Sequence, residues 1–368
     1  MRFSCYQDDL NDALQFVIRA VAVKPQTPVL AGVYIKAEGS VLEVQGNNYA
    51  VGIIVRIPVS TEEPGEVVVS GKKLQEFVRN MPGRTINFFE EDNTLVMESG
   101  GASVRLLTMA AQEFPKVKTP ESEMSFKIQS TALQGLLRRT VFAASKDEGA
   151  RPIFKGCCFE IRNNSINLVA TNTHRLALAK GMLPEDYNEM SFVVPADTLR
   201  DIMNRIDSKD TDNYVTVKYS PRFVTFTFDN VFVTARLIEG TFPPYDRVIP
   251  TSSTTRVTVE TKDFKEAVEL VALMSKETEY NTVKLVFNNN GIEISSDSPE
   301  IGGAVKAVEA SIEGDDLEIS FNAGYIADML KIVDTAKVDI ALNDKFSPAA
   351  FTEPGNENYI YIATPVRT

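Results

Sequence analysis

An internal repeat runs through the whole chain of 368 residues. Residues 3–21, 126–144 and 257–275 align with one another without a gap. In each copy, a short stretch of alternating apolar residues leads into an amphipathic stretch with helical spacing. A fixed period of this kind is typical of chains built from similar structural units. We therefore expect three domains of one kind, each beginning with a strand followed by a helix.

A second group of repeated segments lies further along each copy, at residues 67–81, 192–206 and 319–333. These segments also pass from an apolar alternating stretch into a helical stripe, so the chain contains six predicted strand-then-helix units. Polar residues near the start of each first-group helix are expected to cap it. They are Asp8 and Asp9, Ser130 and Thr131, and Thr261 and Asp263.

Between these units, β-branched and aromatic residues alternate with polar ones, for example in residues 41–57, 165–181 and 214–238. Such runs predict antiparallel strands and hairpins. The expected fold class is α+β, with three similar domains that each contain two β-α-βββ halves packed helix to helix against sheets. Connectors at residues 119–123 and 250–254 place the domains at 1–120, 121–252 and 253–368.

Composition excludes several classes of protein. The chain is 43% apolar and 24% charged, and no uninterrupted apolar run is long enough to cross a membrane. The N-terminus lacks the pattern of a secretory signal, so we expect a cytoplasmic protein. The net charge of −12 argues against bulk attraction to nucleic acid, and any DNA contact must be local. Cys5, Cys157 and Cys158 have no disulfide, metal or redox spacing and are interpreted as buried apolar residues.

Enzymatic motifs are also missing from the sequence. The single histidine, His174, has no nucleophile motif, ligand pair or phosphate-binding glycine loop around it. The acidic clusters at residues 90–92 and 185–186 resemble solvated turns rather than metal sites. We therefore expect a non-catalytic protein without metal or cofactor.

Six similar helices in one chain favour closure into a ring, because similar interfaces bend an array by a similar angle each time. A head-to-tail dimer would place twelve helices inside and the sheets outside. At about 8–10 Å per helix, less one helix diameter of about 10 Å, the opening would be roughly 20–28 Å, enough for a B-form duplex. The helical segments are also less acidic than the whole chain, which has 38 Lys and Arg against 50 Asp and Glu. A merely solvated helix face would explain that enrichment equally well.

Four segments together resemble one known family: ATNTHRLA at 170–177, GTFPPYDRVIP at 240–250, FNAGY at 321–325 and TPVRT at 364–368. In order and spacing they are similar to the bacterial DNA sliding clamps, the beta subunits of DNA polymerase III. The resemblance implies the DNA clamp fold and a homodimeric ring that encircles duplex DNA without reading its sequence. It also implies three kinds of partner: a clamp loader, the replicative polymerase, and other proteins with clamp-binding motifs. The expected location is the cytoplasm, at the nucleoid during replication. An oligomeric peptide-binding adaptor that never encloses DNA remains the alternative.

The resemblance also assigns sites. A peptide-binding cleft between the second and third domains would contain Phe154, Thr171, Thr173, His174, Arg175, Leu176, Pro243, Arg247, Val248, Tyr280, Asn322, Tyr325, Phe346, Pro348, Ile362, Thr364, Pro365, Val366 and Arg367. DNA-facing residues would be Lys24, Lys72, Arg79, Lys146, Arg151, Arg200 and Arg205. The dimer seam would join Lys73 and Leu106 of one chain to Leu273 and Met274 of the other. Two departures stand out: Asn172-Thr173 replaces the family's usual Asp-Gly turn, and Pro152-Ile153 replaces aromatic residues after Arg151.

Overall fold

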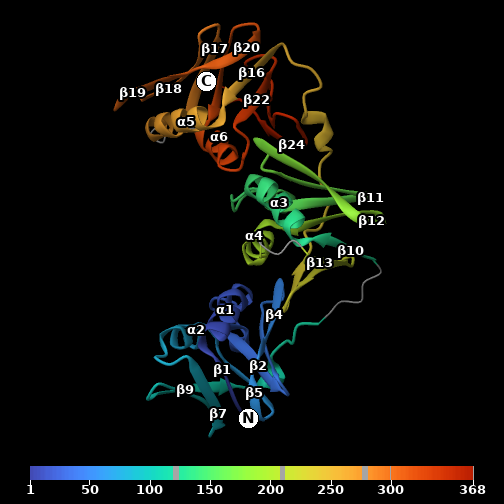
Figure 1. Cartoon of the computed structure of the whole chain (residues 1–368), viewed down its shortest axis with the longest axis vertical. Coiled ribbons are helices and arrows are strands. Elements are labelled where there is room, and N and C mark those ends of the chain that lie inside the picture. Colours follow the sequence, from blue (N-terminus) through green and yellow to red (C-terminus); the bar gives the residue numbers. More distant parts are fainter. Residues whose placement is uncertain (119–123, 208–211, 276–280, 299, 368) are drawn as a thin grey trace. The chain divides into compact units, whose positions relative to one another are not determined.

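The computed structural model describes residues 1–118, 124–207, 212–275, 281–298 and 300–367. Within these residues the α-helices are α1 (Gln7–Val17), α2 (Gly71–Asn80), α3 (Ser130–Thr140), α4 (Ala196–Arg205), α5 (Thr261–Ser275) and α6 (Ala323–Leu330) (Figure 1). The strands that precede them are β1 (Arg2–Tyr6), β6 (Gly65–Ser70), β10 (Met124–Gln129), β12 (Arg175–Pro195), β16 (Thr255–Glu260) and β21 (Leu317–Asn322). Each strand leads directly into its helix, which confirms the predicted strand-then-helix units.

The predicted capping residues of the first helix are wrong. Helix α1 begins at Gln7, immediately after the last strand residue, and its N-cap residue Tyr6 makes no side-chain cap hydrogen bond. Asp8 and Asp9 instead lie in the first turn, where a carboxylate interacts favourably with the positive end of the helix dipole. The strand runs into the helix without the intervening residue that a side-chain cap would need.

Internal contacts divide the chain into two compact units. Unit 1 comprises Met1–Gln134 and Asp197–Leu237, and unit 2 comprises Gly135–Ala196 and Ile238–Thr368. Unit 1 contains a sheet in the order β10-β13-β14-β15-β4-β3-β2-β6-β9-β8-β7-β1-β5. Its remaining strands are β2 (Gly32–Glu38), β3 (Val41–Asn47), β4 (Val51–Pro58), β5 (Ser60–Glu63), β7 (Thr85–Glu91), β8 (Thr94–Ser99), β9 (Ala102–Met109), β13 (Tyr214–Tyr219), β14 (Phe223–Phe228) and β15 (Val231–Arg236).

Unit 2 contains two sheets, in the orders β11-β12-β24-β23-β22-β16-β20 and β19-β18-β17-β21. The remaining strands are β11 (Gly156–Thr171), β17 (Thr282–Asn288), β18 (Gly291–Ser298), β19 (Gly302–Val308), β20 (Ala310–Gly314), β22 (Lys337–Leu342), β23 (Ala349–Glu353) and β24 (Asn356–Ala363). Neighbouring strands in both units pair antiparallel, for example β11 with β12 and β17 with β18. The α+β class with antiparallel sheets is confirmed.

The central repeat is shared between the two units. In unit 1, β15 pairs with β4, with Val231 opposite Val55. In unit 2, β12 pairs with β24, with Arg175 opposite Ala363. Each half of the central repeat is thus hydrogen-bonded into the sheet of a neighbouring repeat. The boundaries at 120/121 and 252/253 stay predictions, and the connector at 119–123 lies outside the described residues.

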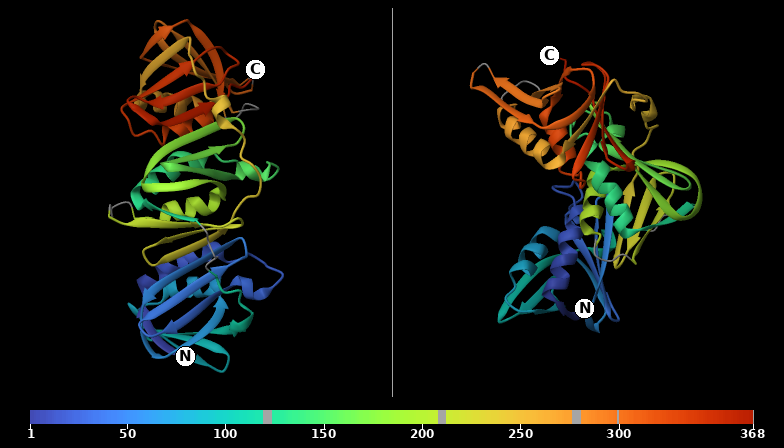
Figure 2. Two further views of the ribbon diagram at one scale, coloured as in Figure 1. Left: turned by 90° about the vertical axis from the view of Figure 1, so that its right-hand side faces the viewer. Right: turned by 45° about the horizontal axis from the view of Figure 1, so that its top comes forward.

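The apolar stripes of the helices form the core, as expected. Leu10, Leu14 and Val17 of α1 are fully buried, and α1 packs beside α2 against the blue strands of unit 1 (Figure 2). Cys157 and Cys158 are buried free cysteines, and burial raises the pKa of each thiol to about 12. They therefore behave as the small apolar residues predicted. In the part of the chain that the structure describes, no helix is both long and apolar enough to traverse a bilayer.

Candidate functional site

The turn between β11 and β12 is the first element of the site, and Asn172 holds it. The Asn172 Oδ1 atom accepts hydrogen bonds from the N–H groups of His174 at 3.1 Å and Arg175 at 2.9 Å. Thr173, with a φ of 77°, donates its N–H to the Thr171 hydroxyl oxygen at 3.1 Å. A positive φ is costly for a β-branched residue. The side-chain hydrogen bonds therefore stabilise a turn that has no glycine.

Arg175 is buried beneath the site surface. Only 6% of it is exposed, and its Nη1 donates to Asp328 at 2.9 Å while Nη2 donates to the Phe142 carbonyl at 2.6 Å. The guanidinium carbon lies 4.6 Å from the centroid of the Tyr325 ring and 5.5 Å from that of Phe142. All these partners belong to the chain itself. The resemblance assigns Arg175 to the cleft, and these contacts place its guanidinium as a support beneath the Tyr325 ring.

Tyr325 is fixed from both ends. Its hydroxyl accepts from the Asn172 side-chain amide at 3.1 Å, and its carbonyl accepts from the Tyr361 hydroxyl at 2.9 Å. Its N–H donates to Asn322 Oδ1 at 3.2 Å, which caps the start of α6. A ring held in this way forms a rigid, half-buried aromatic wall beside the turn at Asn172.

An apolar cluster forms the floor. Leu176 lies opposite Ile362 in the β12–β24 ladder, both are almost fully buried, and Phe154 packs against them. The chain after β24 is tied down because the Thr364 N–H and hydroxyl each donate to the His174 carbonyl at 2.9 Å. The Val366 N–H donates to the Ser320 carbonyl at 2.8 Å in the same way. Strands β12 and β24, helix α6 and the C-terminal segment thus converge at one place.

The other predicted cleft residues differ in how firmly the structure places them. The 3-10 turn Tyr245–Val248 is anchored by Tyr245 in the apolar cluster, so Val248, 45% exposed, lies at its rim. Tyr280 lies outside the described residues. Six further predicted cleft residues are exposed or partly exposed, and none of them belongs to the apolar floor: Pro243, Arg247, Phe346, Pro348, Pro365 and Arg367. Their assignment to the cleft stays a prediction.

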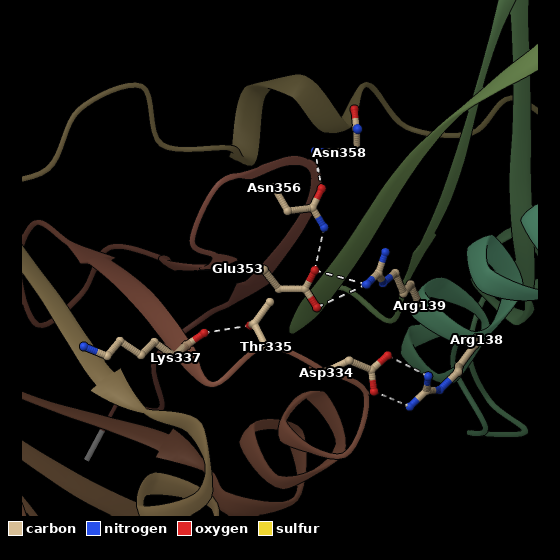
Figure 3. A network of polar contacts seen from close by, with 8 residues as sticks. All are labelled: Arg138, Arg139, Asp334, Thr335, Lys337, Glu353, Asn356 and Asn358. Carbon is tan, nitrogen blue, oxygen red and sulfur yellow. Dashed lines mark hydrogen bonds and ion pairs between the residues drawn. The ribbon is translucent and has the colours of Figure 1, made fainter.

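Two ion pairs fix α3 against the third repeat within unit 2 (Figure 3). Arg138 makes a bidentate pair with Asp334 at 2.8 and 2.9 Å, and Arg139 contacts Glu353 at 3.1 Å. The Glu353 side chain is only 1% exposed, so its carboxylate depends on Arg139 for compensation. Because Phe142 follows α3 and accepts from Arg175, these pairs also determine where Arg175 and the wall above it lie. Sequence analysis missed Phe142 and Asp328, although the spacing of Asp328 three residues after Tyr325 places both on one helix face.

The predicted DNA-facing residues fall into two groups. Lys24, Lys72, Arg79, Lys146 and Arg151 are exposed, and no salt bridge joins them to a carboxylate in the described part of the chain. The other two are neutralised locally. Arg200 is paired with Asp197, and Arg205 with Asp12 at 2.6 Å. The two groups therefore differ in whether a carboxylate of the described chain already compensates their charge, and the assignment of all seven residues to DNA stays a prediction.

The predicted seam residues differ in exposure. Leu106 is only 9% exposed because its side chain points into the core of its own chain, while Leu107 beside it on β9 is 78% exposed. Alternation along a strand turns neighbouring side chains to opposite faces, so Leu107 is the exposed residue of this pair, and the assignment of Leu106 to the seam stays a prediction. Leu273 on α5 is 64% exposed, as a seam residue should be. Lys73 is exposed and pairs with Glu76 at 3.0 Å.

Comparison with known proteins gives a match over the full length of the chain. Three family models match in order: DNA polymerase III beta subunit, N-terminal domain, at residues 1–118; central domain, at 127–244; and C-terminal domain, at 246–367. The beta sliding clamp of Bacillus subtilis is 32% identical, with 100% of each chain covered. The crystal structure of a Bacillus subtilis DNA polymerase sliding clamp superposes with a TM-score of 0.94 at 31% identity, covering 100% of this chain and 99% of that one. A sliding clamp from Pseudomonas aeruginosa bound to griselimycin superposes with a TM-score of 0.94 at 27% identity over both full chains.

Proposed function

Because the chain belongs to the family of bacterial DNA sliding clamps, the DNA polymerase III beta subunits, we propose that it forms a head-to-tail homodimeric ring around duplex DNA and acts without chemistry of its own. Domains at 1–120, 121–252 and 253–368 belong to this proposal. The observation that carries it is the pair of unsatisfied surfaces that the chain presents, one in each unit.

Both surfaces contain the edge of a sheet. Strand β19 pairs only with β18, and residues 103–106 of β9 pair only with β8 among the described residues. Leu107 beside the first edge, and Ile301 and Val305 beside the second, are at least 60% exposed. Exposed apolar edges recruit a further strand, so natural proteins leave them open mainly where another chain covers them. Joining β9 of one protomer to β19 of its partner satisfies both edges.

The helices beside the two edges have complementary charge. Helix α2, which contacts β9, contains Lys72, Lys73 and Arg79 with one acidic residue, Glu76. Helix α5, which contacts β19, contains three acidic and two basic residues and exposes Leu270 and Leu273. Opposite charge across an interface favours this pairing over the pairing of like surfaces. Two unlike surfaces that meet twice, around a twofold axis, close a ring of two chains.

The cleft at Tyr325 is proposed as the docking site for segments of the clamp loader, the replicative polymerase and other proteins with clamp-binding motifs. Its apolar floor suits an aliphatic or aromatic side chain, and the fixed Tyr325 wall gives the pocket a defined shape. A peptide-binding adaptor would use the same cleft. The two edges and the exposed basic residues of α2 favour the clamp over the adaptor.

Contact with DNA is proposed to occur through exposed basic residues that have no carboxylate partner, and Lys72 and Arg79 test this. Replacing both by glutamine is expected to weaken equilibrium binding to short duplexes of any sequence. The slope of log K against log salt should become shallower by about one per residue. Lys180→Gln, which removes an exposed charge from strand β12, is the matched control. An equal loss with Lys180→Gln, or an unchanged slope in the double variant, would contradict the assignment.

A further inference from the structure

A hollow of about 760 Å³ lies within unit 1, away from every site assigned so far. It opens where the turn between β3 and β4 meets β14, β15 and the segment after β9. Its lining includes the aromatic residues Tyr49, Phe114 and Phe223 together with Pro115 and Val117. It is therefore an apolar hollow with an aromatic rim, which is the usual character of a ligand pocket.

The turn that forms one wall repeats the turn of the candidate cleft bond for bond. Asn48 Oδ1 accepts from the N–H groups of Ala50 at 3.0 Å and Val51 at 2.8 Å, as Asn172 does in the cleft. Tyr49 has a φ of 68° and occupies the position that Thr173, also with a positive φ, has in the cleft turn. The hollow is thus the counterpart, one repeat earlier, of the proposed peptide cleft.

Strand registers and hydrogen bonds extend this correspondence to the other walls. The Arg236 N–H donates to the Ala50 carbonyl at 2.8 Å, as the Thr364 N–H does to the His174 carbonyl at 2.9 Å. Equivalent positions, with the hollow residue first, are Asn47 and Thr171, Tyr49 and Thr173, Ala50 and His174, Gly52 and Leu176, Pro115 and Pro243, Phe223 and Pro348, and Thr234 and Ile362. The same backbone frame therefore surrounds both pockets.

The side chains of the two pockets differ. The floor of the hollow has Gly52 and Thr234 where the cleft has larger aliphatic residues, and Val117 packs into the space that a larger side chain at Gly52 would fill. The rim contains two lysines. Lys116 contacts Glu66 at 2.9 Å, but exposed Lys118 makes no salt bridge with any described carboxylate. The Lys118 ammonium group therefore lines the hollow without a carboxylate partner among the described residues, and a carboxylate of a ligand complements it.

We propose that this hollow is a second docking site, for a short peptide segment of a partner protein that carries an apolar side chain flanked by acidic residues. The segment packs its apolar side chain against the aromatic residues Tyr49 and Phe223 and places a carboxylate near Lys118. The inference rests on the proposed function only for the comparison with the cleft, since the walls and charges of the hollow are its own. A ring with this site in each protomer holds two classes of partner at once.

The chain contains no tryptophan, so single-tryptophan variants of the full chain report each pocket separately. Tyr49→Trp reports the hollow and Phe346→Trp reports the proposed cleft, because both side chains are more than half exposed. The probe is the peptide acetyl-Asp-Leu-Phe-Asp-amide, with acetyl-Lys-Leu-Phe-Lys-amide as its charge-reversed control. In the unsubstituted protein, the NMR chemical shifts of the Val117 methyl groups follow the same titration. This second measurement does not depend on whether a tryptophan variant folds.

We expect saturable responses from Tyr49→Trp and from Val117, with the basic peptide binding about three- to fivefold more weakly, the effect of one exposed charge pair. Adding Lys118→Glu should weaken binding of the acidic peptide by a similar factor, whereas Lys180→Glu, which changes an exposed lysine of unit 2, should not. If only the Phe346→Trp fluorescence changed, and the Tyr49→Trp fluorescence and Val117 shifts did not, this inference would be overturned and the proposed cleft would be supported. If the Tyr49→Trp fluorescence and Val117 shifts changed and the Phe346→Trp fluorescence did not, the hollow would be supported and the cleft assignment would fail. Equal binding of both peptides at the hollow would also overturn the inference.

Discussion

Leu273→Asp combined with Leu107→Asp is expected to convert the dimer into monomers. Each substitution puts a carboxylate into an apolar interface, and burying an unpaired charge there costs at least about 2 kcal/mol. Because each of the two identical seams would then contain two carboxylates, the cost per dimer is about 8 kcal/mol or more, which raises the dissociation constant by about five orders of magnitude or more. Sedimentation equilibrium measures that constant directly.

The control for the seam is Met182→Asp, which charges an exposed apolar residue on β12, outside both edge surfaces. It should leave the dimer unchanged. A dimer that persists in the Leu273 and Leu107 variant, with unaltered circular dichroism, would show that these edges do not form the seam.

Tyr325→Ala is expected to abolish most of the affinity of the cleft for acetyl-Asp-Leu-Phe-Asp-amide, by about thirtyfold or more. The aromatic wall supplies contact area at small entropic cost, and its loss also uncovers the guanidinium of Arg175. Tyr325→Phe keeps the ring but loses the hydrogen bond from Asn172, so its affinity should fall only a few fold. Fluorescence of the Phe346→Trp reporter measures both variants. Equal losses in the two would show that the ring is not a wall of the cleft.

Arg175→Ala should show whether Arg175 supports Tyr325 or contacts the bound peptide directly. The substitution leaves the Phe142 carbonyl without its donor and removes the charge between two rings, so thermal stability of unit 2 should fall together with affinity. Tyr325→Ala should reduce affinity with a smaller loss of stability, since its side chain is only partly buried and carries no charge. If the Arg175→Ala variant kept its full thermal stability but lost its affinity for the peptide, the guanidinium would instead contact the peptide directly.

The repeated helical stripes made much of the fold predictable from the sequence. Residues such as Leu10 and Leu133 are buried because an amphipathic helix has one way to face a sheet, and that information is local. The division of the central repeat between two units was not predictable, because pairing of β15 with β4 joins residues far apart in the chain. The register of a strand was not predictable for the same reason. A shift of one residue exchanges the two faces of a strand, and on β9 it would exchange buried Leu106 with exposed Leu107.

The roles of side chains in the candidate site were not predictable from the sequence. Resemblance named Arg175 as a cleft residue, but only three-dimensional geometry revealed that Asp328 neutralises its guanidinium, and that the Phe142 carbonyl accepts a hydrogen bond from it, beneath Tyr325. The departure at Asn172 and Thr173 removes the glycine that is usual in the family's turn. The structure instead shows the asparagine side chain supplying the hydrogen bonds that hold the turn.

Retention on circular DNA tests the ring most directly. The protein is loaded onto a nicked circular plasmid by an ATP-driven loader, freed of unbound protein by gel filtration, and then divided into intact and restriction-cut portions. A ring should remain on the circle and be lost from the linear product, and blocking both ends of the linear DNA should restore retention. Equal retention on open circular and unblocked linear DNA would contradict the ring and favour an adaptor that binds without enclosing the duplex.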